Sequence, residues 1–153
     1  MIIFDVLKEY DKQKVRLYVD MDGVIADYDV GIPAKYDKKR PLISNLEKLE
    51  KISKMPNIDL YILSVTRMTE GIYEKNRWLD INAPFFKKEK RNILSREMVN
   101  FEKNALELKY KFMQDLERDD SQIIYIDDDP GILRQIDENM KDIILLKDTT
   151  LVE

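Results

Sequence analysis

Residues 16–27 read RLYVDMDGVIAD, and the fold can be worked out from this stretch. The run VRLYV at residues 15–19 is mostly apolar, which is typical of a buried strand. It leads directly into Asp20 and Asp22, and Gly23 then permits a backbone bend that a Cβ would hinder. A lone pair of acids also occurs in ordinary solvated turns. Whether this pair of acids belongs to a functional site therefore depends on the residues that follow the other predicted strands.

Three more short apolar runs predict strands, and segments with helical spacing separate them. The runs are residues 58–63, 123–126 and 143–146. The helical segments are centred on residues 43–52, 72–79, 108–116 and 132–136. This alternation predicts an α/β fold, a three-layer Rossmann-like core with a mostly parallel sheet flanked by helices. For residues 1–14 the sequence leaves a helix and an extra edge strand equally open.

Polar residues end two of the other predicted strands. Ser64 follows residues 60–63, and three consecutive acids, Asp127, Asp128 and Asp129, follow residues 123–126. The carboxyl ends of parallel strands meet at one edge of a sheet, where ligands bind. Three acids at a buried strand end are costly unless a cation or hydrogen bonds compensate them. Together with residues 20–22, they predict a Mg²⁺ site at this edge.

The composition narrows the possible chemistry. The 153 residues include no cysteine and no histidine, which excludes thiol nucleophiles, imidazole bases and cysteine-bound zinc. Carboxylates, hydroxyls and lysines remain, and they suit a hard cation and a carboxylate nucleophile. The length predicts a single domain, residues 1–153. The chain has no apolar run long enough to span a bilayer and no recognisable signal peptide, so we expect a soluble, cytoplasmic protein.

The charge distribution gives little sign of a nucleic-acid surface. The net charge is −4, which provides no electrostatic footprint for duplex nucleic acid. Two basic clusters stand out, residues 38–40 (KKR) and residues 87–91 (KKEKR). We expect them to be solvated surface, and the alternative is a rim that guides an anionic substrate.

The motif DMDGV after an apolar strand, Ser64 after the second strand, a lysine and an acidic strand end resemble the haloacid dehalogenase-like hydrolase superfamily. The resemblance implies that Asp20 is a nucleophile that forms an aspartyl-phosphate. It implies that Asp22 is a general acid and base, which requires an upward pKa shift, and that Ser64 binds the phosphoryl group. Mg²⁺ would be held by Asp20, the backbone carbonyl of Asp22 and Asp127, while Asp128 orients a coordinated water or ligand.

A finer resemblance concerns two short segments. Residues 74–79 (EKNRWL) and residues 126–133 (IDDDPGIL) are similar to the corresponding segments of the 5'(3')-deoxyribonucleotidase branch of that superfamily. This similarity implies that the substrate is a phosphorylated small molecule and that this molecule is a nucleotide.

The lysine implied by the resemblance has three candidates. We favour Lys109, because apolar residues at i+3, i+4 and i+7 place its amine near the strand-end crevice. Lys103 is the second choice and Lys90 the third.

The intervals between the motifs leave little room for a lid. One helix and its loops fill most of the chain between Asp22 and Ser64. Residues 67–109 could form extra helices and a strand, but this stretch is also small for a lid domain. We therefore expect a minimal cap or none, and an open site. The first hypothesis is a phosphomonoesterase, such as a 5'-nucleotidase. The alternatives are a polynucleotide-end phosphatase and a catalytically silent protein that binds Mg²⁺ or a partner, and the oligomeric state stays open.

Overall fold

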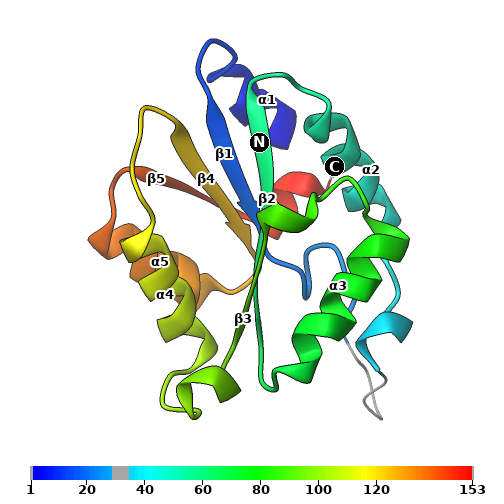
Figure 1. Cartoon of the computed structure of the whole chain (residues 1–153). Helices are drawn as coiled ribbons and strands as arrows, with labels where there is room; N and C mark the ends of the chain where they lie inside the picture. Colours follow the sequence, from blue (N-terminus) through cyan, green and yellow to red (C-terminus); the bar gives the residue numbers. More distant parts are fainter. Residues whose placement is uncertain (1, 29–34, 153) are drawn as a thin grey trace.

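The sheet confirms the predicted α/β architecture. A computed structural model of the chain describes residues 2–28 and 35–152. It contains a five-stranded sheet with the order β3-β2-β1-β4-β5, in which all neighbouring strands are parallel. The strands are β1 (Val15–Val19), β2 (Ile58–Thr66), β3 (Arg91–Ser95), β4 (Gln122–Asp127) and β5 (Ile143–Lys147). Helices cover both faces of the sheet, so the fold has the three layers of a Rossmann-like domain (Figure 1).

Five α-helices form the two outer layers. They are α1 (Ile3–Lys8), α2 (Ile43–Ser53), α3 (Glu70–Asn82), α4 (Ala105–Asp115) and α5 (Pro130–Asn139). Four 3₁₀ turns complete the described elements: η1 (Tyr36–Lys38), η2 (Lys88–Lys90), η3 (Glu97–Val99) and η4 (Asp148–Leu151). Helices α1, α2 and α3 pack on one face of the sheet, and α4 and α5 pack on the other (Figure 1). The question left open for residues 1–14 is answered by helix α1.

Successive residues of the central strand β1 point to opposite faces of the sheet and belong to two separate apolar clusters. Leu17 and Val19 pack in the cluster that includes Trp78 of α3. Tyr18 points to the opposite face and belongs to the cluster that includes Met113 of α4. Because both faces are buried, the strand can be apolar throughout, as the sequence indicates.

Strand β3 is the element that the apolar runs did not locate. Its sequence is RNILS, in which only Ile93 and Ser95 are buried. It lies at the edge of the sheet and pairs with the carboxyl half of β2, from Ile62 to Thr66. The expectation of helices and a strand within residues 67–109 is confirmed, since α3, η2, β3 and η3 lie there.

The register of the sheet brings the polar strand ends to one level. Val19 pairs with Ile62 on one side and with Ile126 on the other. The residues that follow, Asp20 and Asp127 among them, therefore leave the sheet side by side. In the described part of the chain, no helix is long and apolar enough to cross a membrane.

Candidate active site

Three acids from two strand ends form a cluster that could hold a cation. One carboxylate oxygen each from Asp20, Asp127 and Asp128 lies within 4.8 Å of the others. These residues line a cavity of about 430 Å³ together with Asp22 and Lys109. An all-oxygen donor set of this kind suits a hard divalent cation.

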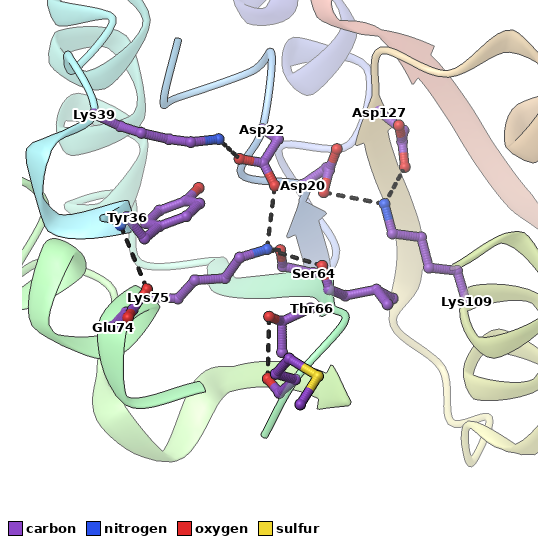
Figure 2. A network of polar contacts seen from close by, with 12 residues as sticks. Asp20, Asp22, Tyr36, Lys39, Ser64, Thr66, Glu74, Lys75, Lys109 and Asp127 are labelled. Atoms are coloured by element: carbon purple, nitrogen blue, oxygen red, sulfur yellow. Dashed lines mark hydrogen bonds and ion pairs between the residues drawn. The ribbon is translucent and has the colours of Figure 1, made fainter. Parts of the chain in front are cut away.

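Lys109 of helix α4 reaches into the acidic cluster. Its Nζ lies 3.0 Å from Oδ1 of Asp20 and 2.8 Å from Oδ2 of Asp127, and its side chain is almost fully buried (Figure 2). The preferred lysine therefore lies at the predicted crevice. The other two candidates do not: within the described residues Lys103 makes no ion pair with these acids, and Lys90 pairs with Asp59 near the start of β2.

Asp127 is the most heavily engaged of the three acids. Its Oδ2 accepts from Lys109 and also from the hydroxyl of Tyr125. Its Oδ1 accepts the backbone N–H of Asp129 at 2.9 Å. Asp128, by contrast, interacts through its carboxyl group with Asp20. Oxygens of Asp20 and Asp128 are thus less occupied by donors of the chain than those of Asp127.

The cluster has an excess of negative charge. Burial raises the pKa of Asp20 to about 7, and Asp127 adds to the shift while Lys109 opposes it. Burial also raises the pKa of Asp128. Two buried carboxylates face a single ammonium group, so a proton or a cation is needed to balance them.

Asp22 has the opposite surroundings. Its Oδ1 lies 2.7 Å from Nζ of Lys39, and its Oδ2 lies 3.1 Å from Nζ of Lys75 (Figure 2). Burial by itself would raise the pKa of Asp22, but the ammonium groups of Lys75 and Lys39 outweigh it and lower the pKa. The expected upward shift of this carboxyl is therefore wrong for this structure.

Lys75 of helix α3 links Asp22 to the end of β2. Its Nζ donates to Oγ of Ser64 at 2.6 Å and to the carbonyl oxygen of Val65 at 2.9 Å. Burial lowers the pKa of Lys75. Ser64 is fully buried, and Val65 lines the cavity at this strand end. The contact of Ser64 with a phosphoryl group stays a prediction, whereas its contact with Lys75 is present.

Lys39 is held in place by the segment around η1. The ring of Tyr36 lies under both ammonium groups, 4.6 Å from Nζ of Lys39 and 5.1 Å from Nζ of Lys75. The indole N–H of Trp78 donates to the carbonyl oxygen of Lys39 at 2.9 Å, and Oε2 of Glu74 accepts the backbone N–H of Tyr36 at 3.4 Å. Helix α3 therefore anchors the segment that carries Lys39.

The two basic clusters of the sequence have different surroundings. The first supplies Lys39 to the site, and its neighbour Arg40 pairs with Asp27. In the second, Lys90 pairs with Asp59, and Arg91 pairs with Asp80 at 2.8 Å. No residue of the second cluster lines the acidic cavity.

Sequence reasoning did not assign Lys75 or Lys39 to the site. Lys75 had a usable signal, because Trp78 and Leu79 follow it at i+3 and i+4 and place it on the buried face of α3. Lys39 had none, because it stands among other basic residues in an irregular segment.

No protein-family model matches this chain, and no curated protein sequence matches it. A functional assignment therefore depends on the arrangement of the side chains. At the end of β1, the acidic cluster of Asp20, Asp127 and Asp128 lies beside a region in which Lys39 and Lys75 contact Asp22.

Proposed function

We propose that this protein is a Mg²⁺-dependent phosphomonoesterase that works through an aspartyl-phosphate on Asp20. The observation that carries the proposal is the presence of acidic and basic groups on opposite sides of that residue. Asp20, Asp127 and Asp128 favour a cation on one side, and the ammonium groups of Lys39 and Lys75 lie on the other, both against Asp22. A phosphoryl group requires both a cation and an anion-binding surface around the attacking oxygen.

The residues present suit Mg²⁺. The candidate ligands are carboxylate oxygens, and no cysteine or histidine exists in the chain to favour a softer metal. Asp20, Asp128 and Asp127 would hold the cation. When bound, Mg²⁺ would neutralise phosphoryl oxygens and the carboxylates that approach them.

Asp20 has the position expected of the nucleophile. It follows the central strand directly, its backbone N–H donates to the carbonyl oxygen of Ile126 at 3.0 Å, and its carboxylate lies against Lys109. An oxygen of Asp20 attacks phosphorus, a bond forms between them, and the bond from phosphorus to the ester oxygen breaks. The phosphoryl group is then carried by Asp20, and the leaving oxygen needs a proton.

Asp22 handles that proton in this proposal. Because its pKa is lowered, it must first take up a proton, and it can take this proton from solvent because its side chain is partly exposed in the cavity. The proton passes to the leaving oxygen. In the second step Asp22 accepts a proton from the water that attacks the aspartyl-phosphate, and inorganic phosphate leaves.

Lys75 and Lys39 would bind the phosphoryl oxygens. Both ammonium groups lie next to the cavity-lining carboxylate of Asp22, so they can attract a dianion that enters the cavity beside Asp20. Tyr36 supports both ammonium groups with its ring.

The substrate we propose is a phosphorylated small molecule, with nucleotides as the first class to assay. A polynucleotide end receives no support from residues 87–91, since Lys90 and Arg91 are paired with acids and lie outside the cavity. A catalytically silent role would be indicated by an inactive wild-type protein that still binds Mg²⁺.

The test is the release of phosphate from a generic aryl phosphate, with and without Mg²⁺, followed by a panel of nucleotides and sugar phosphates. We expect activity that requires Mg²⁺ and that falls at least about a thousandfold in Asp20→Asn, because loss of a nucleophile leaves only binding and electrostatic catalysis. Asp120→Asn is a matched control, because Asp120 is an exposed acid just before the amino end of β4, away from the acidic cluster. Full activity of Asp20→Asn would refute the proposed nucleophile.

A further inference from the structure

Tyr125 lies next to the lysine–aspartate pairs, on the strand that ends in Asp127. Its side chain is fully buried, and its hydroxyl contacts Oδ2 of Asp127. The same oxygen receives Nζ of Lys109 at 2.8 Å. In this contact the hydroxyl donates and the carboxyl oxygen of Asp127 accepts. One carboxylate oxygen is thus shared by a phenol and an ammonium group.

Asp127 is held through both of its oxygens. Tyr125 and Lys109 contact Oδ2, and the backbone N–H of Asp129 donates to Oδ1 at 2.9 Å. Three donors to one buried carboxylate define its orientation. Since Lys109 lies between Asp127 and Asp20, the orientation of Asp127 also determines where the ammonium group points (Figure 2).

We propose that Tyr125 is a positioning residue that holds Asp127 so that the ammonium group of Lys109 stays against Asp20. The inference rests on the proposed function, in which Asp20 is the nucleophile. Without the phenol, Oδ2 of Asp127 loses a donor and attracts Lys109 more strongly. The ammonium group then moves toward Asp127, and the nucleophile loses its counter-charge.

The neighbouring strand offers a matched control in Tyr18. This residue pairs with Tyr125 in the sheet register, is 2% exposed and belongs to the same apolar cluster. Its ring stacks on Tyr61 with 4.6 Å between ring centroids. Its hydroxyl interacts with Arg16 and not with the acids of the site. Tyr18→Phe therefore removes the same atom from the same layer without changing the contacts of Asp127.

The experiment compares wild type, Tyr125→Phe and Tyr18→Phe in the Mg²⁺-dependent hydrolysis of an aryl phosphate, with thermal unfolding to establish that each variant folds. We expect Tyr125→Phe to lower kcat about tenfold and to leave KM nearly unchanged, as for other residues that support a catalytic group from behind. Tyr18→Phe should change neither constant.

A double-mutant cycle separates positioning from a general structural effect. In a Lys109→Met background, Tyr125→Phe should cause no further loss of kcat, because its effect passes through Lys109. A readout independent of turnover is the binding of beryllium fluoride, which mimics a phosphoryl group on an aspartate, in the presence of Mg²⁺. Its affinity should fall in Tyr125→Phe and in Lys109→Met, but not in Tyr18→Phe.

The outcomes distinguish failure of the proposed function from failure of the inference about Tyr125. An inactive wild-type protein would overturn the proposed function, and this inference with it. An active wild type would leave the proposed function standing, and the inference alone would be overturned in either of two cases. One is an unchanged kcat in Tyr125→Phe. The other is that Tyr125→Phe lowers kcat in the Lys109→Met background by the same factor as in wild type.

Discussion

Asp22 illustrates how strongly the neighbours of one side chain determine its chemistry. It lies two residues from Asp20, yet its carboxylate contacts two ammonium groups, whereas Asp20 shares Lys109 with Asp127. The pKa of Asp20 is raised by burial, and that of Asp22 is lowered by Lys75 and Lys39 despite burial. Two acids of one motif are thereby prepared for different work.

Lys39 can be tested against its own neighbour. We expect Lys39→Met to lower kcat/KM by about 10- to 100-fold, because a charge-assisted contact to a phosphoryl oxygen contributes about 1.5–3 kcal/mol. Lys38→Met is the control, since Lys38 is exposed and adjacent in sequence. Steady-state kinetics with one aryl phosphate give the kcat/KM of both variants. Equal effects of the two substitutions would show that only the overall charge matters.

The raised pKa of Asp20 predicts that the stability of the protein depends on pH when no divalent cation is present. Its pKa is about 7 in the folded chain and near 3.8 without burial, so folding favours its protonated form. The stabilisation is complete below pH 3.8 and is lost as pH rises through 7. From pH 5 to 8 we expect the free energy of unfolding to fall, with a slope of at most about 1.4 kcal/mol per pH unit.

Urea denaturation in a metal chelator, repeated at several pH values, measures this slope. Asp20→Asn should make it much shallower, because the amide does not titrate, and the raised pKa of Asp128 accounts for the remainder. The lowered pKa of Asp22 acts below pH 4 and lies outside this window. Parallel curves for wild type and Asp20→Asn would contradict the assignment.

At the scale of the elements, two helices deliver lysines from opposite faces of the sheet. Helix α3 carries Lys75 to the end of β2, and α4 carries Lys109 to the ends of β1 and β4 (Figure 2). Each lysine shares its helix face with buried apolar residues, so packing of the helix determines where the amine lies. The position of a catalytic group therefore depends on the integrity of its helix.

The start of α4 allows this dependence to be tested. Asn104 caps the helix: its side chain accepts from the backbone N–H of Glu107, and the side chain of Glu107 accepts from the backbone N–H of Asn104. We expect Asn104→Ala to destabilise the protein by about 1 kcal/mol and Asn104→Ser to restore most of that loss. Chemical denaturation measures both. Equal stability of the Ala and Ser variants would contradict a capping role.

At the scale of the whole molecule, the strand order places the site. From β1 the chain proceeds through β2 to β3 on one side, and then returns to β4 and β5 on the other. The acidic cavity lies where this order reverses, at the carboxyl ends of β1 and β4. Acids distant in sequence meet there because both strands are central and parallel.

A cation that binds there should stabilise the entire fold. At a Mg²⁺ concentration one hundred times its Kd, we expect the free energy of unfolding to rise by about 2.7 kcal/mol. Thermal unfolding with increasing Mg²⁺ measures the effect, which should disappear in Asp128→Asn and persist in Asp120→Asn. An equal shift in Asp128→Asn would place the cation elsewhere.

Much of the fold and part of the site could be predicted because their signals are local. The apolar runs located β1, β2, β4 and β5, and the acids after β1 and β4 marked the crevice. Strand β3 gave a weak signal, because an edge strand needs few buried residues. Lys109 was identified because its helix has a clear apolar face.

By itself, then, the sequence determined the α/β class, the mostly parallel arrangement of the strands and the acids that follow β1 and β4. Only the tertiary structure decided which lysines join those acids. A lysine side chain is long and flexible, and 26 basic residues leave many candidates. The tertiary structure also set the downward pKa shift of Asp22, since a pKa depends on the distance to charges from other elements: Lys39 beside η1 and Lys75 on α3.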